Sequence, residues 1–314
     1  MAYTIDPGAE LGEELRAVAH DQVQTAIADL DDVVADVVEA VHDCRKRCKK
    51  LRGLVRLVRP ALGEQYTTAN ALFRDAAREL GPLRDAHALL ETFDALCDAQ
   101  REHLPAGGPA AVREQLALRS ERARAAATPD NRRVARALDQ LRQGERLVDE
   151  WTLDASGFDA VAGGLGKTYN RGRGALLAAI EAPTSEAFHE YRKRVKYTWY
   201  HVRLLDETAA GLLPPLGRQL HDLSDTLGDD HDLAVLSEQL LSEPVAFGGD
   251  DEVASTMLVV DGQRADLQRR AVRAGARLHA EKPRAFVRRL GAYWEAWHRH
   301  GPELATGEID ALAV

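Results

Sequence analysis

The sequence predicts an all-α fold, and three observations support this prediction. Hydrophobic residues make up 45% of the 314-residue chain and recur almost everywhere at spacings of three and four, the period of an amphipathic helix. No stretch alternates β-branched with polar residues, as a half-buried strand would. Ala, Leu, Arg, Glu and Asp dominate, and most of these residues favour helices. We therefore expect roughly a dozen helices, paired as antiparallel hairpins.

Clusters of Gly, Pro, Ser and Asp predict where these helices end, because such residues cap or stop helices. The clusters lie at residues 104–109, 128–131, 154–157, 182–185 and 242–251. Beyond them, residues 301–314 are expected to form a flexible C-terminal tail, so the folded part should span about residues 1–300.

The numbers of charged residues and cysteines exclude several classes of protein. There are 41 Lys and Arg against 50 Asp and Glu, and the formal net charge of −9 argues against a non-specific DNA-binding protein. No apolar run approaches the ~18 residues of a membrane span, and the first residues do not resemble a signal peptide, so we expect a cytoplasmic protein without membrane contact. Three cysteines without CxxC spacing predict neither disulfides nor a zinc site, and we expect no metal and no cofactor.

The chain contains an internal repeat. Residues 41–57 (VHDCRKRCKKLRGLVRL) and 188–204 (FHEYRKRVKYTWYHVRL) are identical at eight of seventeen positions, at a constant offset of 147. At the same offset, five further residues are identical: Asp75, Leu80, Gly81, Asp85 and Leu89 match Asp222, Leu227, Gly228, Asp232 and Leu236. This pattern predicts one body built from two related halves, about 10–152 and 153–300, with a pseudo-twofold relation and a shared core.

The repeated segment is a helix with a basic face. When it is placed on a helix at about 100° per residue, its polar arc collects His42, Arg45, Lys49, Arg52 and Arg56, with Lys46 and Lys50 at one margin. The opposite arc is apolar and includes Cys44 and Cys48, which we expect in the core. Residues 41–60 hold eight Lys and Arg but only one acid, Asp43.

The second copy repeats the design. Its basic face carries His189, Arg192, Lys193, Lys196 and Arg203, and Trp199 replaces Arg52. On the preceding helix, Arg171 and Arg173 could line the same surface. Like charges one turn apart repel, so a polyanion or buried carboxylates must offset this repulsion.

A linear phosphate polymer fits the basic row best. From His42 to Arg56 the row extends about 21 Å, and Arg provides paired donors that match phosphate oxygens. Small nucleotides are less plausible because neither GxxxxGK[ST] nor GxGxxG is present. Nucleic acid is disfavoured because base stacking needs aromatic residues, which the first copy's basic face lacks.

These residues resemble the CHAD family, the conserved histidine α-helical domain. The resemblance rests on the repeated His-x-x-Arg-Lys-x-x-Lys helix and on the Leu-Gly-x-x-x-Asp stretch that follows each copy, and it extends from about residue 10 to residue 300. It implies two four-helix bundles related by a pseudo-twofold axis, which bind inorganic polyphosphate along a basic central surface, sometimes at polyphosphate granules. The catalytic triphosphate tunnel domain of many family members is absent, so the resemblance implies no enzyme activity.

We therefore predict a non-catalytic polyphosphate-binding protein. The predicted contacts are His42, Arg45, Lys46, Lys49, Lys50, Arg52, Arg56, Arg171, Arg173, His189, Arg192, Lys193, Lys196 and Arg203. Asp85 and Asp232 are expected to pair with cations. Neighbouring cations should lower the pKa of both repeated histidines.

Three alternatives stay open. The dipeptides His42-Asp43 and His231-Asp232 are weak signs of a metal-dependent phosphohydrolase acting on polyphosphate or nucleotides. An RNA-binding protein or an interaction scaffold would also use a basic face. The oligomeric state is unknown, although Trp294 and Trp297 could serve a homodimer contact.

Overall fold

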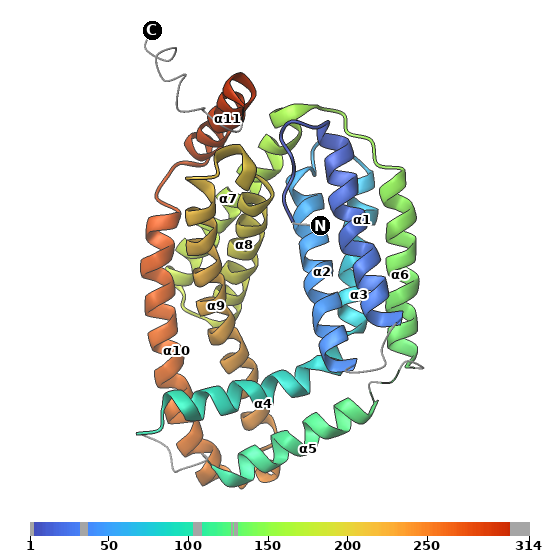
Figure 1. Cartoon of the computed structure of the whole chain (residues 1–314). Coiled ribbons are helices and arrows are strands. Elements are labelled where there is room, and N and C mark those ends of the chain that lie inside the picture. The colour runs from blue at the N-terminus through green and yellow to red at the C-terminus, as the bar shows by residue number, and fades with distance from the viewer. Residues whose placement is uncertain (1–2, 32–36, 103–108, 127, 129–130, 302–314) are drawn as a thin grey trace.

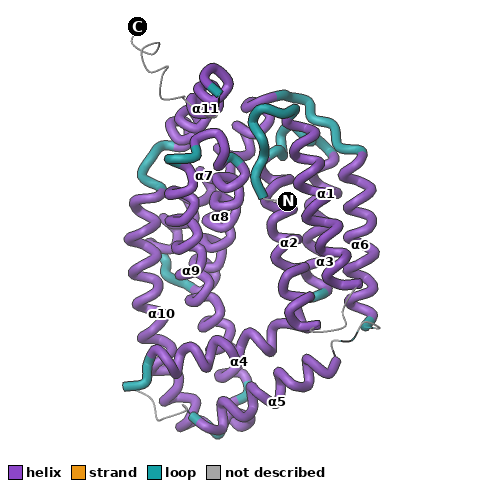
Figure 2. The backbone as a smooth tube through the Cα atoms, in the orientation of Figure 1, coloured by secondary structure: helices purple, strands orange, loops and turns teal. Residues whose placement is uncertain are grey.

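All regular structure in the described part of the chain is helical. The computed structural model describes residues 3–31, 37–102, 109–126, 128 and 131–301, and these form eleven α-helices and two 3₁₀ helices without a strand (Figure 2). The predicted fold class is thus confirmed. None of the described helices combines the length and apolar character needed to cross a bilayer. Apart from Gly301, the predicted tail lies outside the described residues.

The helices follow one another in the order shown in Figure 1. The first half contains α1 (Leu11–Asp31), α2 (Val37–Leu57), α3 (Gln65–Glu79), α4 (Gly81–Ala99), α5 (Ala110–Ala126) and α6 (Arg132–Asp149). The second half contains α7 (Gly157–Glu181), α8 (Ser185–Leu204), η1 (Asp206–Ala209), α9 (Leu213–Ser242), η2 (Pro244–Phe247), α10 (Asp250–Leu278) and α11 (Pro283–His300).

Two groups of four helices make up most of the molecule. In the first ring, α1 packs on α2, α2 on α3, α3 on α6 and α6 on α1; in the second, α7, α8, α9 and α10 close in the same manner (Figure 1). Helix α2 also packs on α7 and α8, and one buried apolar cluster runs through both rings. The pseudo-twofold relation and the division near residue 152 stay predictions.

Helix α4 joins the far ends of the two rings. It leaves the first ring, runs beneath the second and packs on α5 and α9 (Figure 1). A second buried cluster forms there, to which α4 contributes Phe93 and Leu96, α5 contributes Leu116, and α9 contributes Leu236. The second cluster therefore joins α4 and α5 of the first half to α9 of the second.

The helix ends agree in part with the sequence. Breaks at 154–157, 182–185 and 242–251 are confirmed, whereas those at 104–109 and 128–131 fall largely outside the described residues. Four further interruptions were not predicted, at 58–64, 80, 205–212 and 279–282.

One of these interruptions explains the path of α4. Proline lacks the backbone N–H that a continuing helix needs and disfavours helical geometry in the residue before it. Pro82 follows Gly81 at the start of α4, whereas Asp229 stands at the equivalent position of the second half, where α9 continues unbroken. The first half therefore bends where the second stays straight.

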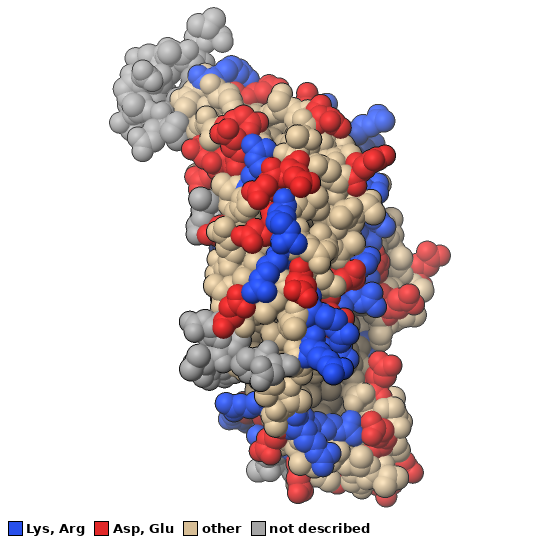
Figure 3. Space-filling model, turned by 90° about the vertical axis from the view of Figure 1, so that its right-hand side faces the viewer, with Lys and Arg blue, Asp and Glu red and all other residues tan. Residues whose placement is uncertain are grey.

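On the outer face of the first ring, acidic and basic side chains are interspersed (Figure 3). Arg142 of α6 pairs with Asp31 at 3.0 Å, and Arg136 and Arg133 approach Glu79 at 3.3 and 3.6 Å. The apolar faces point inward, and Cys44 and Cys48 are fully buried, as expected for core residues.

Candidate functional site

A cavity of about 380 Å³ lies where α2, α4, α8 and α9 meet; we call it the central cavity. Helix α2 contributes His42, Arg45 and Lys49 to its wall, and α8 contributes Arg192. The other charged or titratable lining residues are Arg84 and Asp85 of α4, and His231 and Asp232 of α9. Both copies of the basic helix thus face one shared space.

Arg45 is held in place by α3 and α4. Its Nη1 atom donates a hydrogen bond to the carbonyl oxygen of Ala77 at 2.8 Å, and Nη2 lies 3.8 Å from Asp85 Oδ1. A Cβ atom added to Gly81 would lie only 2.9 Å from Nη1, so the glycine makes room for the guanidinium group. The expected pairing of Asp85 with a cation is present.

Arg192 occupies a matching place in the second half. A Cβ atom on Gly228 would lie 3.3 Å from Arg192 Nη2. Asp232 stands four residues further on, and Arg192 is the strongest of the charges that lower its pKa, against a larger rise from burial. The repeated Leu-Gly-x-x-x-Asp stretch therefore has a physical meaning: its glycine accommodates an arginine of the basic helix, and its aspartate supplies a counter-charge.

Lys49 lies among other cations. Burial, followed by the charges of Lys196, Arg45 and Arg192, lowers its pKa to about 7. The pKa of Lys196 is also lowered, first by burial and then by Arg192. The charge of Asp232 offsets this repulsion only in part, because the pKa of Lys49 stays lowered despite it. Burial raises the pKa of both Asp85 and Asp232. The cluster is arranged to gain from an added anion.

The repeated histidines His42 and His189, and His231 beside them, all have lowered pKa values. The rings of His189 and His231 lie in contact, with their centroids 4.1 Å apart and their planes tilted by 31°, and burial lowers the pKa of each to about 4. His42 is exposed, and its pKa is lowered by desolvation and then by Arg84. The predicted direction of the shift is confirmed, although burial contributes more than the neighbouring cations.

The basic row continues beyond the central cavity. Arg52 and Arg56 both donate to Asn70 Oδ1 of α3, and the Arg56 guanidinium lies 4.3 Å from the centroid of the Tyr197 ring. In another direction, Lys50 and Arg203 meet over the Tyr3 ring, at 5.4 and 6.0 Å from its centroid.

The remaining predicted residues lie at the margin or elsewhere. Lys46 and Lys193 are exposed and pair with acids of their own helices, Asp43 at 3.1 Å and Glu190 at 2.5 Å. Arg173 donates to the carbonyl oxygens of His279 and Glu281, beyond the end of α10. Arg171 is exposed, and neither arginine lines the central cavity.

Sequence reasoning did not assign Arg84 or His231 to the site. The offset of 147 relates these two positions, and each precedes the repeated aspartate, so the repeat contained the signal. Arg84 also lines a side cavity of about 470 Å³ between α2, α4 and α5, which His42 shares.

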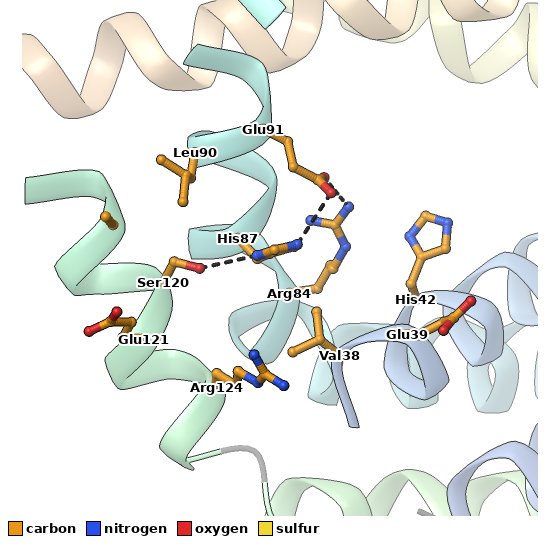
Figure 4. A pocket seen from close by; sticks show the side chains of 11 residues that line it. Val38, Glu39, His42, Arg84, His87, Leu90, Glu91, Ser120, Glu121 and Arg124 are labelled. Carbon is orange, nitrogen blue, oxygen red and sulfur yellow. Dashed lines mark hydrogen bonds and ion pairs between the residues drawn. The ribbon is translucent and has the colours of Figure 1, made fainter. Parts of the chain in front are cut away.

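Figure 4 shows that Glu91 holds Arg84 in this side cavity. Arg84 Nη2 lies 2.6 Å from Glu91 Oε2, while Glu91 Oε1 lies 3.2 Å from His87 Nε2. His87 Nδ1 is in turn 3.1 Å from Ser120 Oγ of α5. This hydrogen-bonded chain connects α5 to the wall of the central cavity and fixes the direction in which Arg84 points.

The arrangement is suited to holding a polyanion. Cations from α2, α4 and α8 surround a solvent-accessible space, and the described residues contain no group of three His, Cys, Asp or Glu that could hold a metal ion. No match was found among curated proteins. The model of the CHAD domain matches residues 17–241, which includes α2 to α8 and ends within α9, and CHAD domains are associated with polyphosphate binding. Since this match covers well over half of the chain and contains both basic helices, the protein belongs to the CHAD domain family.

Proposed function

We propose that the protein binds inorganic polyphosphate in the central cavity and along the adjoining basic row, without catalysing a reaction on it. One observation carries the proposal: Arg45 and Lys49 from one repeat line the same cavity as Arg192 from the other. Burial, followed by the charges of Lys196, Arg45 and Arg192, lowers the pKa of Lys49 there to about 7. Bound phosphates would separate and neutralise these cations.

The chemistry of the side chains favours a phosphate chain over a single small anion. Guanidinium groups offer two parallel donors to phosphate oxygens, and ammonium groups add mobile point charges. Arg52 and Arg56 extend the cation row along α2 past the cavity, so successive phosphates have successive partners. Association with polyphosphate granules follows as part of the proposal, because a binding module of this kind would be recruited wherever the polymer accumulates.

The proposal is tested by titration with polyphosphates of defined length, with RNA and ATP as competitors, at two salt concentrations. Each phosphate contact should contribute a slope of about −0.7 to the plot of log affinity against log salt, by analogy with single-stranded nucleic acids. Replacement of both Arg45 and Arg192 by Gln should weaken binding and reduce the slope by about 1.4.

Three results would contradict the proposal. If the double variant kept wild-type affinity and slope, the central cavity would not be the site. Equal competition by RNA at equal phosphate concentration would favour the RNA-binding alternative. Metal-stimulated release of orthophosphate from polyphosphate would favour the phosphohydrolase.

A further inference from the structure

A second basic groove lies outside the central cavity, between α9 and α10; we call it the outer groove. Its volume is about 640 Å³, and α10 lines it with Arg270, Arg273 and Arg277. These three side chains are exposed and occur at spacings of three and four, so they lie along one face over about 10 Å. Asp222 of α9 is the single carboxylate among the described residues of the lining.

These arginines differ from the others on the same helix. Arg264 pairs with the buried Asp230 at 3.1 Å, and Arg269 pairs with Asp266, whereas Arg270, Arg273 and Arg277 form no ion pair within the described structure. On α6, three of the arginines approach carboxylates: Arg133, Arg136 and Arg142.

Stabilisation of the helix explains only part of this row. A cation in the last turn of a helix interacts favourably with the helix dipole, which accounts for Arg277. Arg273 and Arg270 lie about one and two turns earlier, where the effect has faded. Arg270 is close enough to Asp229 to lower its pKa, although burial raises that pKa more and the two groups form no ion pair. Like charges at this spacing are unfavourable unless an anion is present.

A series of neighbouring residues, not one continuous cavity, leads from the central cations to the outer groove. Lys196 Nζ lies 6.0 Å from the centroid of the Trp199 ring. Trp199 and Arg203 line an intermediate cavity of about 660 Å³ at the start of α9, together with Arg218. This intermediate cavity and the outer groove share Gln219 and Asp222, so they adjoin.

We infer that the outer groove is a second anion-binding site, which holds a further stretch of a polyphosphate chain that leaves the central cavity past Trp199. This inference rests on the proposed function. It predicts that the protein distinguishes chains by length, because a short chain fills the central cavity and only a long chain reaches α10. Helix α10 lies outside the residues matched by the CHAD model, so the three arginines of the outer groove lie beyond that match, whereas its α9 wall lies within it.

The test compares long-chain polyphosphate with tripolyphosphate on a variant in which Arg270, Arg273 and Arg277 are all replaced by Gln. Affinity for the long chain should fall about tenfold or more, and its salt slope should be reduced by about 2, for three lost contacts. Affinity for tripolyphosphate should stay within about twofold of wild type, because a chain of three phosphates fits within the central cavity and does not reach the three arginines. Asp222→Asn removes the negative charge from the lining of the outer groove, so this variant should bind the long chain more strongly than wild type.

A matched control carries the same loss of charge elsewhere. Arg122, Arg132 and Arg284 are exposed, form no ion pair within the described structure and line none of the described cavities, so their replacement by Gln should leave long-chain affinity near wild type. An equal loss in this control would show a general effect of net charge and overturn the inference.

The remaining outcomes are also decisive. Unchanged long-chain binding in the outer-groove variant, or an equal loss for tripolyphosphate, would overturn the inference and leave the central site intact. A loss seen with single-stranded RNA but not with polyphosphate would assign the groove to a nucleic acid and overturn it as well. If the Arg45 and Arg192 double variant kept its affinity for both chains, the proposed function would fail, and the extension from the central cavity with it.

Discussion

Lys49 links the affinity of the central cavity to pH. In the empty protein its pKa is about 7, because burial and three neighbouring cations disfavour the ammonium form. A bound phosphate favours that form and raises the pKa again. At any pH between about 7 and the higher pKa that Lys49 has in the complex, binding of phosphate is therefore accompanied by the uptake of a proton.

We predict that polyphosphate affinity falls as pH rises from 7 to 9, by up to about tenfold per pH unit for one proton. Lys49→Arg should flatten this dependence, because arginine stays charged throughout the range. Some dependence should persist, since the pKa of Lys196 is lowered too. Titration of a long chain at fixed ionic strength measures the effect, and equal slopes for wild type and Lys49→Arg would contradict the assignment.

The lowered pKa of Lys49 also affects the stability of the empty protein, but its contribution to the free energy of unfolding changes with pH in the opposite direction to the affinity. Lysine in an unfolded chain has a pKa near 10.4, so the unfolded state holds a proton that folded Lys49 has lost between pH 7 and 10.4. The contribution of Lys49 to the free energy of unfolding rises over that interval. A loss of affinity from pH 7 to 9 is thus separable from unfolding, which would lower both quantities.

At the scale of single helices, the faces of the two basic helices were predictable and their neighbours were not. Periodicity predicts that Cys44 and Cys48 lie on the buried side of α2, and both are fully buried. The bend between α3 and α4 is not among the predicted breaks, although Pro82, next to the repeated Gly81, is a residue that interrupts helices. The place of Arg173 depends on carbonyl groups more than a hundred residues away, which no local pattern reveals.

A glycine in the middle of α9 offers a test of how the site is built. Replacement of a mid-helix glycine by alanine usually stabilises a protein by about 0.5–1 kcal/mol. At Gly228 the new Cβ atom would lie 3.3 Å from Arg192 Nη2, so the guanidinium group must move by a few tenths of an ångström. We predict that Gly228→Ala weakens polyphosphate binding severalfold while the free energy of unfolding is unchanged or higher.

The matched control for this variant is Gly262→Ala in α10. Nothing lies within 4 Å of a Cβ atom at Gly262, so this change should stabilise the protein and leave affinity as it was. Chemical denaturation and calorimetric titration measure the two quantities for both variants. If Gly228→Ala bound polyphosphate as tightly as Gly262→Ala, the contact between Arg192 and Gly228 would be irrelevant to binding.

For the whole molecule, the net charge of −9 conceals a separation of charges. Acidic residues pair with arginines over the outer face of the first ring, while cations of both repeats gather in the central cavity and arginines without an ion pair in the described structure lie along the outer groove. The repeat indicated that the halves were related, and their basic faces could be predicted from the sequence. The sequence did not allow the prediction that both faces meet in one cavity, because the contacts of α2 with α7, α8 and α4 are formed only in the tertiary structure.

One shared cavity and two independent sites predict different stoichiometries. If the halves share the central cavity, Arg45→Gln and Arg192→Gln each weaken the same binding event, and the number of tripolyphosphate molecules bound per chain stays unchanged. With one independent site in each half, either variant would retain a site of wild-type affinity and bind half as many molecules. Because Lys196 and Arg192 both lower the pKa of Lys49, the cations of the two halves already interact in the empty protein. We therefore expect the first result in calorimetric titrations, with Arg122→Gln on the exposed face of α5 matching wild type in affinity and stoichiometry.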